Sequence, residues 1–322
     1  MVCDAPPRLC GFLVLDKPSG ITSHACVAAV RRSYGLRRVG HGGTLDPAVT
    51  GVLPVAIGAA TRLLPYLCGE KCYRGVVQLG LRSSSDDLQG TVLERRPLPA
   101  LSEPQLEAAL EPFRGRIEQV PPQVSAVHVA GERAYARARR GEAMDLPPRI
   151  VTIEHLALIG WDGASGRLEL EVRCSAGTYI RSLARDLGAS LGCGGALASL
   201  RRTAALGFDL AAAVSLEQLG AAPPPPLDPL AALGHLPRRQ LAPEEIDAWR
   251  CGRKLEAGRL SPAPSRPPPA DPEAAVAMAG EAAACEAVGA VAVLGPDGQL
   301  AGIARHSPCG ALQPRLVFDA AG

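Results

Sequence analysis

The sequence is poor in aromatic residues and contains no long hydrophobic run. Aromatic side chains make up 3% of the 322 residues, so each tyrosine or tryptophan is a candidate for a distinct role. No apolar segment approaches the roughly 20 residues that a membrane-spanning helix needs. The first residues include Asp4, Pro6 and Pro7 and differ from a signal peptide. We therefore expect a soluble, cytoplasmic protein, and the hydrophobic content of 47% argues against global disorder.

Metal-binding cysteine motifs are also missing. The ten cysteines are scattered along the chain, and none forms a Cys-x-x-Cys pair. Cys68 and Cys72 are the closest two, and no histidine beside them would complete a metal site. We therefore expect reduced thiols that serve mainly as small core residues, and no metal centre.

Lysine is rare, and the charge balance alone does not identify a partner. The formal net charge of +2 is too small to indicate a nucleic acid. Lysine occurs only as Lys17, Lys71 and Lys254, so nearly all the positive charge is arginine. Arginine suits bidentate phosphate contacts and stacking on bases. A genome that favours GC-rich codons explains the same composition equally well.

Hydrophobic patterning predicts a mixed arrangement of strands and helices. Ser23 is expected to cap a helix that runs to about Tyr34, and Ser102 with Gln105 forms a capping-box pattern. Strands are expected at 11–15, in the apolar segment that follows Asp46 and includes 51–54, and at 73–79, 150–161 and 167–174, with further helices at 102–114 and 179–191. Because strands and helices interleave irregularly, we expect an α+β fold with a mixed sheet and flanking helices.

One loop carries an aspartate in a setting suited to chemistry. Asp46 lies in the glycine-rich segment 39–54. Gly42 and Gly43 permit tight turning and close approach of a ligand, and Pro47 favours an extended conformation at the preceding residue. A fixed carboxylate is what a catalytic acid, base or nucleophile requires. A plain Asp-Pro turn is the alternative reading of this segment alone.

Four ordered segments together resemble a known family. Residues 40–54 resemble the signature of the TruB family of tRNA pseudouridine synthases, and the segments 16–23, 71–80 and 174–181 resemble further blocks of that family. The resemblance covers about residues 11–220 closely and the tail more loosely. It implies a pseudouridine synthase fold, α+β, with a thumb-like insertion and a small carboxyl-terminal PUA-like β domain.

This resemblance suggests a domain organisation. We expect a tail at 1–10, a catalytic domain at 11–220 with an insertion at 119–149, a proline-rich linker at 221–228 and a small domain at 229–322. Within the small domain we expect a helix near 243–251, a disordered proline-rich segment at 261–276 and a hairpin at 289–304.

The family's reaction breaks the bond between N1 of uracil and C1′ of ribose, rotates the base and joins C5 to C1′. It needs no redox chemistry and no energy input, so we expect no cofactor and no metal. A base within a folded RNA loop has to be flipped into a pocket. Asp46 matches the family's catalytic aspartate. Attack on C1′ as a nucleophile and removal of the 2′-hydrogen as a base both remain open for it.

The resemblance also assigns pocket residues around Asp46. Tyr73 matches the aromatic residue that stacks on the uracil and assists the late proton removal from C5. Arg181 matches the basic residue that pairs with the aspartate, and Tyr179 and Leu200 match pocket-lining residues. Taken alone, a tyrosine such as Tyr73 in a strand is more often a packing residue, and an arginine such as Arg181 near a helix start is more often a solvated surface charge.

Three further residues are implied in supporting roles. Lys17 lies in the block that resembles the buttress beneath the site, and Asp87 matches an acidic position near it. His41 matches an RNA-contacting residue that supports the flipped loop. A direct role for His41 in proton transfer is the alternative.

The insertion at 119–149 resembles the part of bacterial relatives that grips the T-loop. Its arginines Arg133, Arg137, Arg139 and Arg140 stand within eight residues and suit phosphate binding. An ordinary solvated helix face is the alternative interpretation.

We therefore predict an isomerase that acts without a cofactor on uridine 55 of the T-loop, with the T-arm and elbow of tRNA as its partner. We expect a monomer that binds no metal and no membrane. The alternatives are a guide-RNA-dependent synthase that modifies rRNA and a non-catalytic chaperone that helps tRNA fold. A glycoside hydrolase is more distant, because it needs two carboxylates and only Asp46 stands out.

Overall fold

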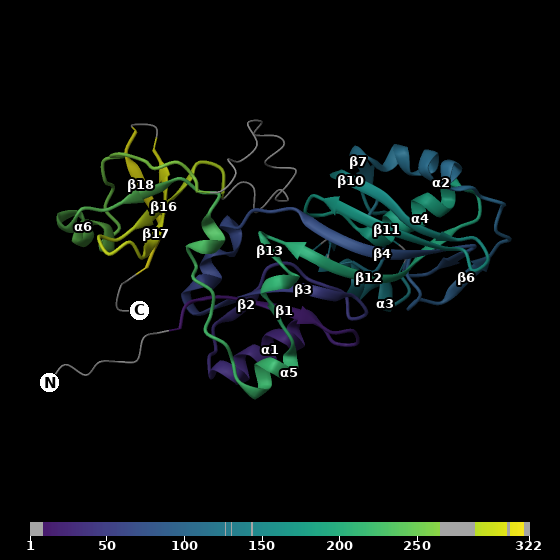
Figure 1. Ribbon diagram of the computed structural model, residues 1–322, viewed down its shortest axis with the longest axis horizontal. Coiled ribbons are helices and arrows are strands. Elements are labelled where there is room, and N and C mark those ends of the chain that lie inside the picture. Colours follow the sequence, from purple (N-terminus) through teal and green to yellow (C-terminus); the bar gives the residue numbers. More distant parts are fainter. Residues whose placement is uncertain are drawn as a thin grey trace. The chain divides into compact units, whose positions relative to one another are not determined.

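The computed structural model describes residues 9–125, 127–129, 131–142, 144–264, 287–307 and 310–318 (Figure 1). The chain divides into two compact units. Unit 1 comprises Met1–Pro47, Gly51–Gly69 and Ala204–Gly322, and unit 2 comprises Ala48–Thr50 and Glu70–Thr203. Unit 1 is therefore built from both ends of the chain, and unit 2 from its middle.

Unit 1 contains two sheets and several short helices. In chain order its elements are β1 (Gly11–Lys17), α1 (Ser23–Tyr34), β2 (Val39–His41), β3 (Thr50–Ile57), η1 (Gly58–Tyr66), β13 (Phe208–Asp209), η3 (Leu210–Ala212), β14 (Ala213–Val214), α5 (Leu216–Ala221), η4 (Ala231–Leu233), β15 (Arg238–Gln240), η5 (Pro243–Glu245), α6 (Ile246–Arg250), β16 (Ala290–Leu294), β17 (Leu300–His306) and β18 (Leu312–Val317).

The first sheet of unit 1 is centred on two apolar strands. β1 pairs antiparallel with β3, and β3 pairs antiparallel with β2. On its other side β1 pairs parallel with β14, which comes from the carboxyl-terminal part of the chain. β1 and β3 are buried along nearly their whole length. Their continuous hydrophobic sequences follow from that burial, because a strand covered on both faces has no need of alternating polar residues.

The predicted helix after β1 is present, but its cap is not the expected residue. Thr22 is the N-cap of α1, and its hydroxyl accepts a hydrogen bond of 3.0 Å from the backbone N–H of Ala25. The prediction that Ser23 caps this helix was therefore wrong by one position. Ser23 is buried, and its hydroxyl instead bonds to the loop that carries Asp46.

The second sheet of unit 1 has the order β15-β16-β17-β18. β15 lies parallel to β16, and the other pairs are antiparallel, which confirms the hairpin predicted at 289–304. Trp249 of α6 is fully buried against this sheet and donates a hydrogen bond of 2.9 Å to the carbonyl of Ala301. Most of the segment predicted to be disordered, 261–276, lies outside the described residues. The predicted domain boundaries at 220 and 228 remain predictions.

Within the described residues, unit 2 contains one large antiparallel-rich sheet covered by helices, and two small sheets of two strands each. Its elements are β4 (Lys71–Leu79), β5 (Leu81–Ser83), β6 (Val92–Arg95), α2 (Glu103–Leu110), η2 (Glu111–Phe113), β7 (Gly115–Gln119), β8 (His128–Val129), β9 (Glu132–Arg133), α3 (Ala134–Arg139), β10 (Arg149–Asp162), β11 (Arg167–Cys174), α4 (Ile180–Ser190) and, running to the boundary with unit 1, β12 (Gly195–Ala205). The sheet order is β12-β4-β11-β10-β7.

Alternation along β11 determines which face of this sheet is covered. Leu168, Leu170 and Val172 are buried, whereas Arg167 and Glu169 between them are exposed. The buried face packs against leucines of α2 and α4 in one hydrophobic cluster. Both helices lie along one side of this sheet (Figure 1). The mixed sheet with flanking helices that the sequence predicted is confirmed.

Candidate active site

Asp46 lies in the loop between β2 and β3 of unit 1, and its side chain is half-buried. Two glycines shape this loop. Gly43 has a φ of 101°, which only glycine adopts without strain. A Cβ at Gly42 would lie 2.5 Å from the side chain of Leu206. The loop therefore follows a path that larger residues at these positions would prevent.

Hydrogen bonds hold the loop on both sides of Asp46. The hydroxyl of Ser23 accepts from the backbone N–H of Leu45 at 2.9 Å and donates to the Leu45 carbonyl at 3.1 Å. The carbonyl of Pro47 accepts from the backbone N–H of Gly20 at 2.8 Å. Because the residues before and after Asp46 are both bonded to the β1–α1 segment, the backbone that carries this carboxylate is fixed.

Lys17 reinforces the same loop from below. Its side chain is fully buried, and its ammonium donates to the carbonyls of Pro18, Ile21 and Pro47 at 2.9, 2.7 and 3.0 Å. These three bonds use all three of its donors. Burial lowers the pKa of Lys17, while the charges of Cys26 and Asp46 act in the opposite direction. Lys17 thus bonds to the Asp46 loop and to the segment after β1 through backbone carbonyls. Its role as a buttress beneath the site remains a prediction.

His41 ends β2 immediately before the loop, and its ring is half-buried. It meets the ring of His24 from α1 edge to face, with 5.9 Å between the ring centroids. Sequence reasoning did not single out His24, although a helix that packs along β2 brings it there.

In unit 2, Tyr73 and Arg202 form a buried pair that sequence reasoning only half identified. Tyr73 of β4 is 6% exposed and Arg202 of β12 is fully buried. Burial lowers the pKa of the Arg202 guanidinium, and a hydrogen bond with the side chain of Tyr73 acts in the opposite direction. Burial likewise lowers the pKa of Lys71, and the charge of Arg202 lowers it further. The hydroxyl end of Tyr73 therefore lies in a cationic environment.

Arg181 and Asp87, which the sequence predicted separately, lie close together in unit 2. Arg181, near the start of α4, is 6% exposed and donates to the carbonyls of Ser85 and Val124 at 3.0 and 2.8 Å. Its Nε lies 3.8 Å from Oδ2 of Asp87. The carboxylate of Asp87 also accepts from Ser85 Oγ at 2.5 Å and from the Gln89 N–H at 3.0 Å. These bonds hold the guanidinium in one orientation.

A second acidic residue beside this pair is held under strain. Asp86 has a φ of 59°, uncommon for a residue other than glycine, and its carboxylate lies 3.1 Å from Arg185. Burial raises the pKa of Asp86, and the charge of Arg185 opposes that shift.

Tyr179 and Leu200 occupy supporting positions in unit 2. The backbone N–H of Tyr179 donates to the side chain of Gln119 at 2.8 Å, and its ring packs against the small cluster that includes Met144 and Leu146. Leu200 packs against the main core of the unit beside Gly75. The roles that the resemblance implies for these residues remain predictions.

Two of the four arginines of the predicted thumb form ion pairs with neighbouring carboxylates. Arg137 pairs with Glu142 at 2.8 Å, and Arg140 pairs with Glu132 and Glu142 at 2.6 and 2.7 Å. The guanidinium of Arg139 lies 5.5 Å from the ring centroid of Tyr135. The side chain of Arg133 lies outside the described part of the chain. Their predicted contact with RNA remains a prediction.

The described residues contain no group of three or more histidine, cysteine or acidic side chains that would hold a metal ion. Within the same residues no helix is long and apolar enough to cross a membrane. The seven described cysteines are free thiols. Burial raises the pKa of the Cys174 thiol to about 12, so this sulfur is a packing group rather than a nucleophile.

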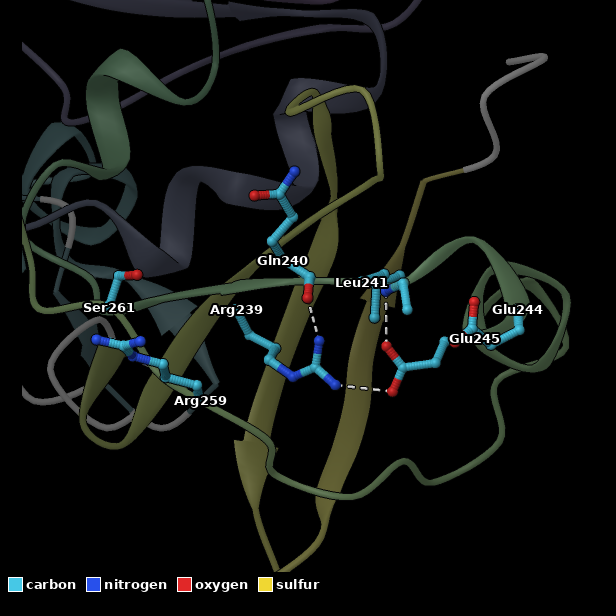
Figure 2. Close-up of a pocket in the computed structure, with 8 residues that line it drawn as sticks. Arg239, Gln240, Leu241, Glu244, Glu245, Arg259 and Ser261 are labelled. Carbon is cyan, nitrogen blue, oxygen red and sulfur yellow. Dashed lines mark hydrogen bonds and ion pairs between the residues drawn. The ribbon is translucent and has the colours of Figure 1, made fainter.

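A separate concavity of about 560 Å³ lies in unit 1 beside β15 (Figure 2). It is lined by Arg239, Arg259 and Ser261 among others, and Arg239 is already bonded to Glu245 at 2.7 Å. None of the residues predicted for the site lines it.

Sequence comparison places most of the chain in one family. Residues 31–180 match the profile described as the TruB family pseudouridylate synthase (N terminal domain). Residues 181–223 match the tRNA pseudouridylate synthase B C-terminal domain.

Similar proteins carry one name. A tRNA pseudouridine synthase B of Parasynechococcus marenigrum (strain WH8102) is 59% identical over 97% of this chain and 98% of that protein. Proteins of the same name from Synechococcus sp. (strain WH7803) and Prochlorococcus marinus (strain MIT 9313) are 56% and 52% identical, over 97% of this chain and 98% of each protein.

Two solved structures share the fold at low identity. One is described as an H/ACA RNP bound to a substrate RNA containing 2′-deoxyuridine (TM-score 0.68, 22% identity, 97% of this chain and 86% of the other). The other is the archaeal box H/ACA sRNP Nop10-Cbf5 complex (TM-score 0.65, 24% identity, 96% and 86%). At these identities the likeness concerns the fold alone.

Proposed function

Since the chain belongs to the TruB family of pseudouridylate synthases, we propose that it converts a uridine of tRNA to pseudouridine. The substrate is uridine 55 of the T-loop, and the enzyme acts as a cytoplasmic monomer without a guide RNA. The observation that carries this proposal is the 59% identity with a tRNA pseudouridine synthase B over 97% of the chain.

Asp46 supplies the carboxylate of the reaction. Attack on C1′ and removal of the 2′-hydrogen both begin from an ionised aspartate at a fixed position. The bonds of Leu45 to Ser23 and of Pro47 to Gly20 and Lys17 provide such a position. A carboxylate on a preformed loop needs little reorganisation when the flipped nucleotide arrives. The proposed catalytic role of Asp46 therefore agrees with how the loop is built.

The residues of unit 2 serve the same reaction in the proposal. Tyr73 stacks on the uracil, a contact worth about 1–3 kcal/mol for a base on an aromatic ring. Its hydroxyl assists removal of the proton from C5, and the hydrogen bond with the buried guanidinium of Arg202 holds that hydroxyl in place. Arg181 acts as a cation whose orientation is fixed by Asp87, Ser85 and Val124.

A tritium-release assay tests the function directly. Forming the C5–C1′ bond expels the hydrogen at C5. A tRNA transcript made with 5-³H-uridine should therefore release tritium into the solvent when it is incubated with the wild-type enzyme and no guide RNA. Asp46→Asn should lower the rate by at least about 10²–10⁴-fold while tRNA binding is retained.

Asp209→Asn is the matched control. Asp209 is an exposed aspartate whose Oδ1 accepts from the N–H of Ala211, and asparagine keeps that bond. Its activity should equal that of wild type. Release by Asp46→Asn at the wild-type rate would show that the catalytic assignment is wrong. Tight binding without release by any variant, wild type included, would favour the chaperone reading, and modification only with added guide RNA would favour the guide-dependent one.

A further inference from the structure

Four arginines stand together at the end of α1 without a nearby acidic residue in sequence. Arg31, Arg32, Arg37 and Arg38 fall within eight residues, and no aspartate or glutamate occurs between Lys17 and Asp46. All four side chains are exposed. We call these residues the arginine cluster.

The turn after α1 draws the cluster together. Gly35 ends the helix in the left-handed conformation, and the N–H of Leu36 donates back to the carbonyl of Arg31 at 3.0 Å. The guanidinium of Arg31 reaches across the turn to the carbonyl of Val39 at 3.1 Å, and Nε of Arg38 donates to Thr61 at 2.9 Å. These contacts fix two of the four arginines and keep the turn folded back on the helix.

A strip of polar residues links the cluster to the Asp46 loop within unit 1. His24 and Arg31 are seven residues apart on α1, so they lie on the same face of the helix. His24 meets the ring of His41, and Arg31 bonds to Val39 at the other end of β2. The cluster therefore lies along β2, on the side of α1 that also reaches the residues next to the loop.

The cluster differs from the arginines in and just after α3, which form ion pairs with neighbouring carboxylates. Arg137 and Arg140 are held by Glu132 and Glu142. None of the four cluster arginines forms an ion pair with any residue that the structure describes. Their charge is thus available to an external anion without first breaking an internal ion pair.

The kind of anion follows from the surroundings. Guanidinium groups bind phosphate oxygens in a bidentate manner. None of the large hydrophobic side chains that are exposed among the described residues belongs to α1 or to the turn that carries the cluster, whereas a lipid-binding helix presents an apolar face beside its basic residues. The arrangement fits a run of phosphates along a polynucleotide.

We infer that the arginine cluster binds backbone phosphates of the tRNA close to the modified uridine. This inference rests on the proposed function, because the nucleic acid it commits to is that enzyme's substrate. It assigns the principal phosphate contacts of unit 1 to α1 and the turn after it.

The test uses Arg32→Gln combined with Arg37→Gln. Neither side chain makes a hydrogen bond or ion pair with the rest of the described chain, so the fold should be retained, as a thermal melt would verify. Affinity for a tRNA transcript should fall about 10-fold at low salt, and the slope of log K against log salt should shrink by about 1–2. KM for tRNA should rise with it.

Arg95→Gln combined with Arg167→Gln is the control. Both residues are exposed, form no ion pair within the described chain and lie in unit 2, and their loss removes the same net charge. The affinity of this control variant for tRNA, the salt dependence of that affinity and the rate of tritium release should all equal those of the wild type.

Three outcomes would overturn the inference. An unchanged salt slope in the cluster variant, with a wild type that still releases tritium, would reject the cluster and leave the proposed function intact. An equal loss in both variants would show a general charge effect. If the wild type binds phosphatidylserine vesicles, and the cluster variant loses that binding but keeps its affinity for tRNA, the cluster binds a membrane surface rather than tRNA. A wild type that releases no tritium would fail the proposed function itself.

Discussion

Arg202 illustrates how much one buried side chain determines about its neighbour. A fully buried guanidinium is costly unless polar groups compensate it, and the hydroxyl of Tyr73 is one such group. The same contact keeps the tyrosine ring in one orientation. Stability of unit 2 and the chemistry proposed for Tyr73 therefore depend on the same hydrogen bond.

A double-mutant cycle measures this dependence. Tyr73→Phe and Arg202→Gln should each lower the free energy of unfolding, and the double variant should lose about 1–2 kcal/mol less than the sum because the shared bond is lost only once. Urea unfolding of the four proteins gives the coupling energy. Arg167→Gln, on an exposed residue of β11, should show no coupling with Tyr73→Phe. If the effects of Tyr73→Phe and Arg202→Gln on the free energy of unfolding were additive, the two side chains would not share a stabilising hydrogen bond.

Because His235 is buried, the free energy of unfolding should depend on pH. Its Nε2 lies 2.9 Å from the carbonyl of Tyr66, and burial lowers its pKa below the ordinary value of 6.5. The unfolded chain therefore binds a proton at a higher pH than the folded chain. The free energy of unfolding should fall as the pH drops through 6.5, and should go on falling until the lowered pKa of the folded state is passed.

Denaturant unfolding at several pH values from 7.5 downward, on wild type and His235→Gln, tests this prediction. The glutamine variant should lose this component of the pH dependence. Identical pH profiles for the two proteins would show that His235 does not contribute it.

At the level of elements, two adjacent residues at the start of α1 have different structural roles. Thr22 caps the helix, whereas Ser23 turns inward and bonds to both backbone groups of Leu45. The hydroxyl of Thr22 thus stabilises the start of the helix, and the hydroxyl of Ser23 stabilises the loop that carries Asp46.

Replacing each hydroxyl separates these tasks. Thr22→Ala should cost about 1 kcal/mol of stability and leave turnover near wild type. Ser23→Ala should cost about 1–3 kcal/mol and also lower kcat by about 10–100-fold, because the carboxylate loses its fixed position. Thermal unfolding and single-turnover tritium release measure the two effects. Equal kcat values for the two variants would argue against a positioning role for Ser23.

The sequence predicted the elements better than the details of their ends. Alternation in β11 and the capping box at Ser102 were informative because each depends on neighbours within a few residues, and the structure has both. The cap of α1 was misplaced because serine and threonine at consecutive positions carry the same capping signal. Arg202 was missed because a cation in a strand reads as a solvent-facing residue, and its burial depends on β4, far away in the chain.

At the level of the whole molecule, unit 1 is assembled from segments that are distant in sequence. β1 pairs with β14, and the ring of Phe12 contacts that of Phe208 with centroids 5.6 Å apart. Pairing over such a separation follows from the complete core rather than from local pattern, so the sequence did not predict it. Unit 2 by contrast is nearly continuous, from Glu70 to Thr203.

Truncation after Thr203 should therefore affect the two units differently. Without the returning segment, β1 loses its parallel neighbour and the packing of Phe208, and its amide protons should lose hydrogen-exchange protection. Amides of β10 and β11 should remain protected, because their partners are all within unit 2. Hydrogen exchange followed by mass spectrometry measures both regions, and full protection of β1 in the truncated chain would contradict this view.

The pairing of β1 with β14 also has a consequence for the timing of synthesis. About 200 residues separate Leu15 from its partner Val214, which at about 5–20 residues per second takes roughly 10–40 seconds to translate. During that interval the amino-terminal strand leaves the ribosome with one edge uncovered, a state open to chaperones and to wrong strand partners. The loop with Asp46 belongs to that same early segment, so the strand that precedes it gains its parallel partner only when about two thirds of the chain has been made.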